Sequence, residues 1–197
     1  MRVQVFDHME QCTEAEVQRM LPLVSAQRRE QALQYKHTFG QFCCLKSWLM
    51  LFDHVDMSSY RHTEWSYNEH GKPYIENAPY FSISHCKQGI AVAIDDQPIG
   101  IDIEAIRHAD PELIARTMNE EEQSRIENRE SRIESARAFT RLWTQKEAVL
   151  KAQGIGIASF EQLQNTLSSC RHTDITTVEK EKYIYSIAYG KLHCIGA

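Results

Sequence analysis

Hydrophobic positions in the middle of the chain fall in short runs separated by turn residues, a pattern that predicts β-strands. Residues 80–85 form a run that ends in Ser84 and His85, residues 89–94 are wholly apolar, and residues 99–106 alternate. We expect these consecutive strands to pair as an antiparallel meander. Further strands are predicted at 3–6, 65–67 and 182–189, the last with a turn towards 192–195.

Apolar positions at three- and four-residue steps predict helices in the N-terminal region. Thr13, followed by Glu16 at the third position after it, fits a capping box and marks a helix start. Ser25 can cap a second helical stretch, whose apolar period continues to Phe52. Gly40 is expected to bend or split this long element.

Two shorter helices are predicted later in the chain. Asp110 followed by Pro111 is typical of a helix start, because the fixed φ of proline suits the first helical position. Asn119 marks another start. Residues 119–137 are dense in Glu and Arg, so we expect an exposed helix or a mobile loop there rather than a core element. Irregular structure is expected at 157–173.

The longest predicted helix spans 135–153 and ends at Gly154. Glu147 and Lys151 are four positions apart and share one face of it, where a simple surface ion pair is one interpretation. Lys146 falls in the middle of the apolar face. Either its stem lies along the core while the amine reaches solvent, or the amine binds a polar partner near a functional cleft.

Composition narrows the class of protein. The 197 residues suit one large domain or two small halves that share a core, and the charged fraction of 25% and apolar fraction of 42% are ordinary for a globular protein. A net charge of −5 argues against a non-specific nucleic-acid binder. No apolar run approaches membrane-spanning length, and the first residues lack a signal-peptide core. We expect no nucleic-acid or membrane partner.

The six cysteines contain no Cys-x-x-Cys pair, and two of them are adjacent, at Cys43 and Cys44. Adjacent thiols lack the usual spacing of a zinc site. We interpret the cysteines as reduced thiols and expect a cytoplasmic protein.

Two acids interrupt the apolar run at 99–106. Asp102 and Glu104 are two positions apart, so on a strand their side chains project from the same face. Neighbouring carboxylates repel each other, so one is protonated unless a cation lies between them. Such oxygen pairs suit Mg²⁺, which binds one or two carboxylates together with substrate phosphates. An edge strand with two solvated acids is the alternative.

Several short motifs occur in an order that matches a known family. They are Gly71-Lys-Pro73, Phe81-Ser-Ile-Ser-His85, Pro98-Ile-Gly-Ile-Asp-Ile-Glu104, Leu142-Trp-Thr-Gln-Lys-Glu-Ala-Val-Leu-Lys151 and Gly154-x-Gly156. Each motif alone is weak, but the ordered set is specific. On these residues the chain resembles the 4′-phosphopantetheinyl transferase superfamily, of the surfactin-synthetase-activating type.

The resemblance implies an α+β fold of two pseudo-equivalent α/β halves, about 1–97 and 98–197 of a single domain. Each half would be a small, mainly antiparallel sheet with packed helices, and the active site would lie in the cleft between them. The family transfers the phosphopantetheine arm of coenzyme A to a serine of a carrier protein, releasing adenosine 3′,5′-bisphosphate. The implied partner is an apo acyl carrier protein or a carrier domain of a polyketide or non-ribosomal peptide synthetase, and we expect a monomer.

The resemblance also assigns roles to residues. Asp102, Glu104 and Glu147 are implied as Mg²⁺ ligands, and we expect them to lie within a few ångströms of one another. Glu147, directly or through a metal-bound water, is the implied base, and Lys151 is implied to reach the phosphates. The implied contacts to coenzyme A are Arg28, Lys72, Pro73, Ser84, His85, Asp102 and Lys151.

The nucleotide end of the implied site departs from the family pattern. Relatives often carry basic residues where this chain has Gln31 and Cys43, although Lys46 can substitute. The contacts to the 3′-phosphate and adenine therefore stay open.

Two other functions remain as alternatives. A metal-dependent phosphodiesterase or nuclease would also use paired acids with a nearby Glu and Lys. A carrier-protein-binding module without catalytic activity is the other.

Overall fold

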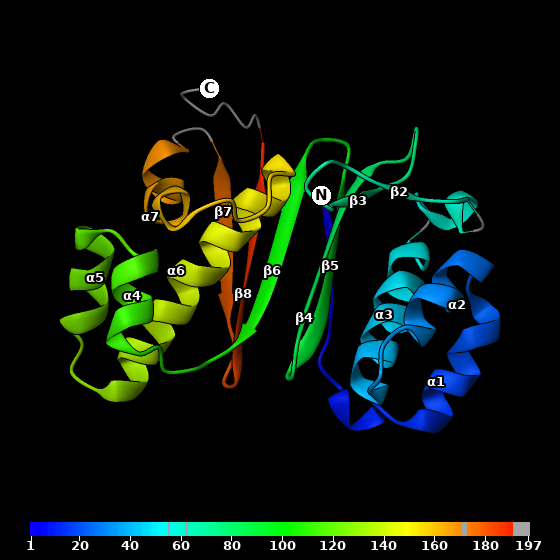
Figure 1. The fold of residues 1–197 in the computed structure, drawn as a ribbon, viewed down its shortest axis with the longest axis horizontal. Coiled ribbons are helices and arrows are strands. Elements are labelled where there is room, and N and C mark those ends of the chain that lie inside the picture. Colours follow the sequence, from blue (N-terminus) through cyan, green and yellow to red (C-terminus); the bar gives the residue numbers. More distant parts are fainter. Residues whose placement is uncertain (55, 62, 171–172, 191–197) are drawn as a thin grey trace.

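In the computed structural model, residues 1–54, 56–61, 63–170 and 173–190 are described; the segment predicted to follow the last turn, 192–195, lies outside them. Helices lie on the outer sides of two small antiparallel sheets, which face each other across the middle of the molecule (Figure 1). This arrangement confirms the predicted α+β class with its small antiparallel sheets.

The elements of the first half follow the predicted order. Its strands are β1 (Arg2–Phe6), β2 (Ser66–Tyr67), β3 (Pro73–Tyr74), β4 (Tyr80–Cys86) and β5 (Gly89–Asp95). Its α-helices are α1 (Glu14–Met20), α2 (Ala26–Leu33) and α3 (Thr38–Phe52), and its short 3-10 turns are η1 (Met9–Gln11), η2 (Leu21–Leu23) and η3 (Ser58–Tyr60).

In its described residues, the second half contains one long helix and three short ones. Its strands are β6 (Ile99–Ala105), β7 (Asp174–Glu179) and β8 (Tyr183–Tyr189). Its helices are α4 (Pro111–Thr117), α5 (Glu120–Glu127), α6 (Arg132–Gln153) and α7 (Phe160–Ser169). In the part of the chain that is described, no helix has both the length and the apolar character needed to cross a bilayer.

Strand pairing differs from the predicted meander. The sheets have the orders β1-β5-β4 and β6-β8-β7, with β2 and β3 as a separate hairpin. β6 therefore pairs with β8, which lies far along the chain, and not with β5, which precedes it. β6 instead lies beside β4, where the hydroxyl of Ser82 accepts a hydrogen bond from the amide of Ile101 at 3.0 Å. The prediction of a continuous meander was wrong at this junction.

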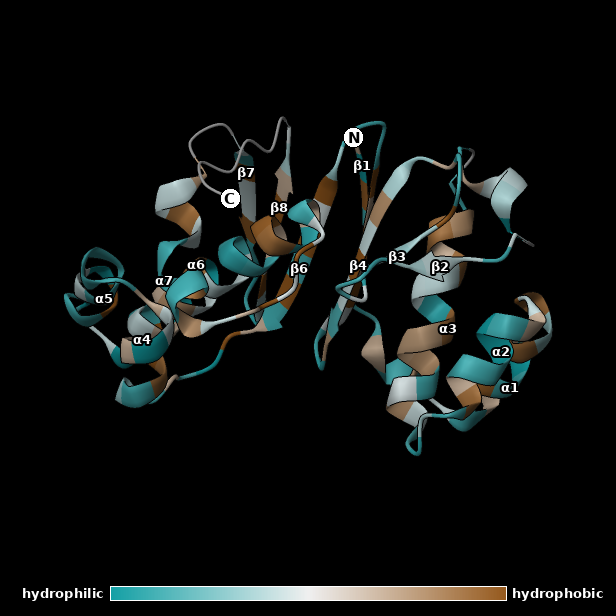
Figure 2. Cartoon of the chain, turned by 45° about the horizontal axis from the view of Figure 1, so that its top comes forward, coloured by the Kyte–Doolittle hydropathy of each residue, from teal (hydrophilic) through white to brown (hydrophobic). Residues whose placement is uncertain are grey.

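The two sheets are held together by their apolar inner faces. Ile90 and Val92 of β5 pack with α3, whereas Ala91 of the same strand packs with Ile101 and Ile103 of β6. β5 is thus covered on both faces, which explains its wholly apolar sequence. Full burial of an isoleucine side chain contributes about 1.5–3 kcal/mol, so this contact fixes the two halves against each other. In Figure 2 the strands at the centre of the molecule, among them β1 and β6, carry brown segments, whereas α5 is mostly teal.

Helix starts follow their caps, with three corrections. The side chain of Thr13 accepts from the amide of Glu16, as predicted, but the Glu16 carboxylate binds Arg19 and does not complete the capping box. The break in the long N-terminal element comes between Leu33 and Thr38, before Gly40, which lies in the first turn of α3. α6 begins at 132 rather than 135, because Ser131 and Glu134 form a full capping box there.

Two predictions about the second half were wrong. Residues 119–137 are not wholly exposed, because Ile126 is 2% and Glu122 is 4% exposed. Ile126 packs with Phe139 of α6, so α5 contributes to a core cluster. The stretch expected to be irregular at 157–173 contains α7.

Candidate active site

The centre of the site is an ion pair between β6 and α6. Asp102 is 3% exposed, and its Oδ1 accepts from Lys151 Nζ at 2.6 Å and from the hydroxyl of Ser84 at 2.8 Å. Lys151 Nζ also donates to Ser84 Oγ at 3.0 Å. Strands β4 and β6 and helix α6 therefore meet at these three side chains, one from each.

A glycine allows this approach. A Cβ atom on Gly100 would overlap the carbonyl oxygen of Ala148 and the amide nitrogen of Ala152, both in the backbone of α6. Glycine at this position lets α6 lie directly against β6. Asp102 and Lys151 are brought together as a consequence.

Two further carboxylates lie in the same cavity, which has a volume of about 420 Å³. Burial raises the pKa of Glu104 to about 7, with the charge of Asp102 as the next cause. Burial also raises the pKa of Glu147, again with Asp102 second. The cavity is lined by Arg28, Gln31, Tyr35, Cys44, Ser47, Tyr67, Pro73, Ile83, Ser84, His85, Asp102, Glu104, Glu147 and Lys151.

The carboxylates do not form a ready metal cluster. Among the described residues, no three His, Cys, Asp or Glu side chains are grouped closely enough to hold a metal ion. The expected gathering of Asp102, Glu104 and Glu147 within a few ångströms is therefore not observed. Asp102 is paired with Lys151 instead.

The site nevertheless fits a divalent cation. Asp102 Oδ2 is buried and has no hydrogen-bond partner among the described residues, which is costly for a carboxylate oxygen. The pKa values of Glu104 and Glu147 are raised because each carboxylate is desolvated near other negative charge. A cation bound at these oxygens would remove both costs, and Mg²⁺ needs only one or two protein carboxylates when phosphates complete its coordination.

A second cavity, of about 290 Å³, adjoins the first. Pro73, Ile83, Glu147 and Lys151 line both. The second cavity extends under the loop between β2 and β3 and along the end of α6. The two cavities therefore adjoin each other at these four residues.

The residues expected near the nucleotide end of coenzyme A are hydrogen-bonded within the protein. Arg28 is 7% exposed, and its guanidinium donates to the Cys44 carbonyl at 3.1 and 2.8 Å and to Gln31 Oε1 at 2.6 Å. It also lies over the ring of Trp48 at 4.3 Å. Gln31 in turn donates to the hydroxyl of Tyr67 at 2.5 Å. Tyr67 was not predicted to line the site. It is 36 residues from Gln31 in the sequence, so no local pattern indicates that the two side chains meet.

His85 and Lys72 line different parts of the cleft. His85 is exposed at the wall of the first cavity, and its ring meets that of Phe39 edge to face at 5.9 Å. Partial desolvation lowers the pKa of His85, with the charge of Lys151 as the second cause. Lys72 lines only the second of these two cavities.

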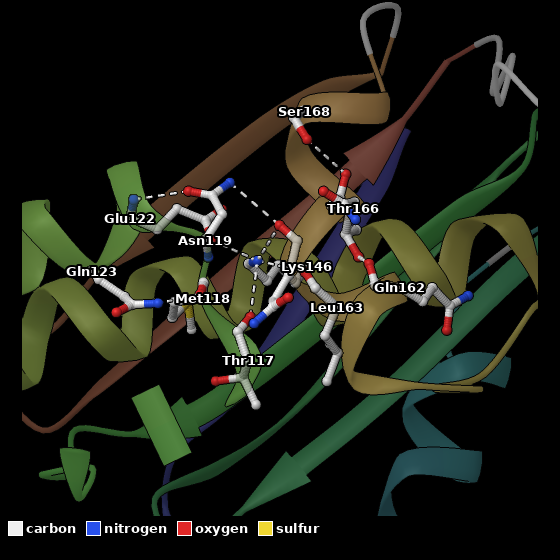
Figure 3. A network of polar contacts seen from close by, with 12 residues as sticks. Thr117, Met118, Asn119, Glu122, Gln123, Lys146, Gln162, Leu163, Thr166 and Ser168 are labelled. Carbon is white, nitrogen blue, oxygen red and sulfur yellow. Dashed lines mark hydrogen bonds and ion pairs between the residues drawn. The ribbon is translucent and has the colours of Figure 1, made fainter. Parts of the chain in front are cut away.

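Lys146 does not reach solvent. It is 0% exposed, and Nζ lies 2.7 Å from Glu122 Oε2 and donates to the carbonyls of Leu163 at 2.5 Å and Thr117 at 3.1 Å. The polar partner that we predicted is present, as Figure 3 shows. It does not lie near the cleft, because α4, α5 and α7 pack on the side of α6 away from the first half (Figure 1). Sequence reasoning found the buried amine but not its location.

Comparison with known proteins places this geometry in context. The model of the 4′-phosphopantetheinyl transferase superfamily matches residues 98–193. The chain is 38% identical to 4′-phosphopantetheinyl transferase gsp of Aneurinibacillus migulanus over 94 residues, which are 46% of this chain and 38% of that protein. It is 29% identical to Sfp of Bacillus subtilis over 154 residues, 74% of this chain and 67% of Sfp. Against AcpT of Salmonella typhimurium the identity is 34% over 111 residues, 54% of this chain and 57% of AcpT. The chain thus spans between 38% and 67% of the length of these relatives.

Proposed function

The chain belongs to the 4′-phosphopantetheinyl transferase superfamily, and we propose that it transfers the phosphopantetheine arm of coenzyme A to a serine of an apo carrier protein. The observation that carries the proposal is the Asp102–Lys151–Ser84 cluster, with Glu147 and Glu104 in the same cavity. The proposed enzyme is one domain over 1–197, acts as a monomer in the cytoplasm, and takes its carrier from fatty-acid, polyketide or peptide synthesis.

In the proposed reaction the carrier serine oxygen forms a bond to the phosphorus next to the pantetheine arm. The bond from that phosphorus to the bridging oxygen of the pyrophosphate breaks, and adenosine 3′,5′-bisphosphate leaves. The serine proton is accepted by the carboxylate of Glu147, which lines the same cavity as Asp102 and Lys151. Such proton transfer contributes about 10²–10⁴ in rate.

Lys151 supplies positive charge to the phosphates. Its ammonium is held by Asp102 Oδ1 at 2.6 Å and by Ser84 Oγ at 3.0 Å, which fixes its position before substrate binds. Ser84 has a second task, because its hydroxyl also accepts from the amide of Ile103 at 3.3 Å and so joins β4 to β6.

We propose that Asp102, with Glu104 and Glu147 from the same cavity, would hold Mg²⁺ once these carboxylates close around the ion, since the described residues do not group them as a ready ligand set. When bound, the ion supplies charge that offsets the negative charge of the pyrophosphate. The orphaned Oδ2 of Asp102 supports this assignment. For coenzyme A itself, the proposed contacts are Arg28, Pro73, Ser84 and His85, all of which line the cavity that contains the carboxylates.

Intact-mass spectrometry tests the function. Purified protein, coenzyme A, Mg²⁺ and one of several apo carrier proteins are expected to give a carrier whose mass is increased by one phosphopantetheine. Chelator stops the addition and excess Mg²⁺ restores it. Glu147→Gln lowers the rate about 10²–10⁴-fold, and Asp102→Asn, which keeps an acceptor for Ser84, also lowers it. Glu112→Gln, at an exposed position on α4, serves as the control and leaves the rate unchanged.

The outcome also separates the alternatives. No mass gain on any carrier, from folded protein that binds coenzyme A, contradicts the transfer reaction and favours a binding module. Hydrolysis of DNA under the same conditions favours the nuclease.

A further inference from the structure

The loop between β2 and β3 contacts the end of α6 through two side chains. Asn68 Nδ2 donates to the carbonyl of Gly154 at 2.7 Å. Lys72 Nζ donates to the carbonyl of Lys151 at 2.6 Å and to that of Ile99 at 2.9 Å. The loop belongs to the first half, whereas all three carbonyls belong to the second.

The loop is built to aim Lys72. Asn68 Oδ1 accepts from the amides of His70 at 3.0 Å and Lys72 at 2.8 Å, which closes the turn from inside. Gly71 has φ of +82°, a left-handed conformation that glycine adopts without strain. The turn therefore presents the Lys72 stem towards α6 in a fixed direction.

The chemistry of the contact favours an ammonium. The last carbonyls of a helix lack partners within the helix and carry its negative dipole end. Lys72 donates to one of them, the Lys151 carbonyl, which also accepts from the Gly154 amide at 3.2 Å, and to the first carbonyl of β6. No ion pair of Lys72 with a carboxylate occurs in the described ranges, and burial lowers the pKa of Lys72 to about 8, with the charge of Lys151 adding to the effect.

The two carbonyls belong to the two elements that carry the site. Ile99 begins β6, which holds Asp102, and Lys151 lies in the last turns of α6, which also holds Glu147. Lys72 does not line the cavity that holds Asp102 and Glu104; it lines the adjoining cavity, which it shares with Glu147 and Lys151. Its ammonium therefore lies where it sets the spacing of β6 and α6.

We infer that Lys72 is a positioning residue: it holds α6 against β6 and so aligns Lys151 and Glu147 with Asp102, instead of binding a phosphate of coenzyme A. The kinetic test of this inference rests on the proposed transfer reaction. The structural test depends only on the hydrogen bonds of Lys72 and Asn68 to the second half.

Lys72→Met removes the donors and keeps the stem, and its kinetics separate the two roles. Misalignment by about 1 Å costs on the order of 10²-fold in rate, so we expect kcat to fall about 10- to 100-fold while KM for coenzyme A stays within about two-fold. Lys72→Arg keeps donors for both carbonyls and should retain more of kcat than Met does. Lys180→Met, at an exposed lysine after β7, is the matched control and changes neither constant.

Asn68→Asp gives an independent variant that touches no proposed substrate contact. It keeps the oxygen that closes the turn but replaces the donor to Gly154 with an oxygen, which repels the carbonyl. We expect kcat to fall and KM to stay unchanged, as for Lys72→Met. A raised KM with unchanged kcat in Lys72→Met, or wild-type kinetics in Asn68→Asp, would overturn the positioning role.

Two measurements that need no catalysis test the role of Lys72 independently of the transfer reaction. Amide hydrogen exchange in peptides covering residues 148–156 should accelerate in Lys72→Met and Asn68→Asp but not in Lys180→Met. Titration calorimetry should give unchanged coenzyme A affinity in Lys72→Met. If wild-type protein modifies no carrier, the transfer reaction fails while these two measurements still decide the role of Lys72. Unchanged exchange, or weakened affinity with unchanged exchange, overturns it.

Discussion

Two lysines on α6, Lys146 and Lys151, have different surroundings: the first is buried and the second is 30% exposed. Lys151 contacts one carboxylate oxygen and one hydroxyl at a cavity wall, where we propose that substrate phosphates bind it. Lys146 is enclosed by Glu122 and by backbone carbonyls of α4 and α7. Burial lowers the pKa of Lys146, and the bond to Glu122 opposes that change. Lys146 therefore has a structural role, whereas the proposed chemical role belongs to Lys151.

The first prediction concerns that enclosed pair. Lys146→Met leaves the Glu122 carboxylate buried without its counter-charge, so we expect the free energy of unfolding to fall by about 3–5 kcal/mol. Lys146→Met combined with Glu122→Gln removes the unpaired charge, keeps the cap on Asn119 and should recover part of the loss. Urea unfolding measures both.

A surface pair provides the comparison for Lys146. Arg116 and Glu112 are 3.4 Å apart and exposed, so Arg116→Met should change the free energy of unfolding by no more than about 1 kcal/mol. A Lys146→Met variant as stable as wild type would show that the buried network contributes nothing to the fold.

At the scale of elements, the contact between α6 and β6 determines the site. Gly100 allows it, Lys72 spans it, and the Asp102–Lys151 pair closes it. The same helix is held on its other side by the Lys146 network, so its position is set from two directions.

The second prediction tests this contact. In Gly100→Ala the new methyl group overlaps the α6 backbone, which cannot rotate away. We therefore expect the free energy of unfolding to fall by at least about 1–3 kcal/mol and the soluble yield to fall. Gly156→Ala is the matched control, since the nearest atom to its Cβ is 3.8 Å away and its φ is ordinary. Thermal unfolding of the two variants decides; equal melting temperatures would mean that α6 can shift away from β6 at little cost.

At the scale of the whole molecule, a side-chain hydrogen bond also joins the first strand of one sheet to the last strand of the other. Tyr183 of β8 donates its hydroxyl to Asp7 Oδ2, just after β1, at 2.9 Å. Burial, and then the hydrogen bond to Asp7, raise the pKa of Tyr183 to about 12. This bond connects the first and last strands of the described fold across the junction of the halves.

The third prediction is a pH dependence. Between pH 10 and about 12 the folded protein keeps the Tyr183 proton while the unfolded chain releases it. The unfolded state then binds fewer protons, so the free energy of unfolding falls as pH rises through this window. Below pH 10, Tyr183→Phe should cost about 1 kcal/mol, and the gap from wild type should narrow towards pH 12. Urea unfolding across that range measures it; a constant gap would contradict the raised pKa.

Local features were predictable because their causes are local. The caps at Thr13, Ser25 and Asp110 lie within three residues of the amides that they accept from. The strand pattern around Asp102 and the helical spacing of Glu147 and Lys151 depend only on the two periods of the backbone. These signals were enough to identify the family motifs and the α+β class.

Other features depended on contacts between distant positions. The sequence by itself determined which residues are candidates for the chemistry, because motif order and period are written along the chain. Only the tertiary structure decided that β6 pairs with β8, that Ser82 and Ser84 join β4 to β6, and that Lys72 binds carbonyls. Each of these depends on which backbone groups lie nearby after folding, and chain spacing carries no information about that.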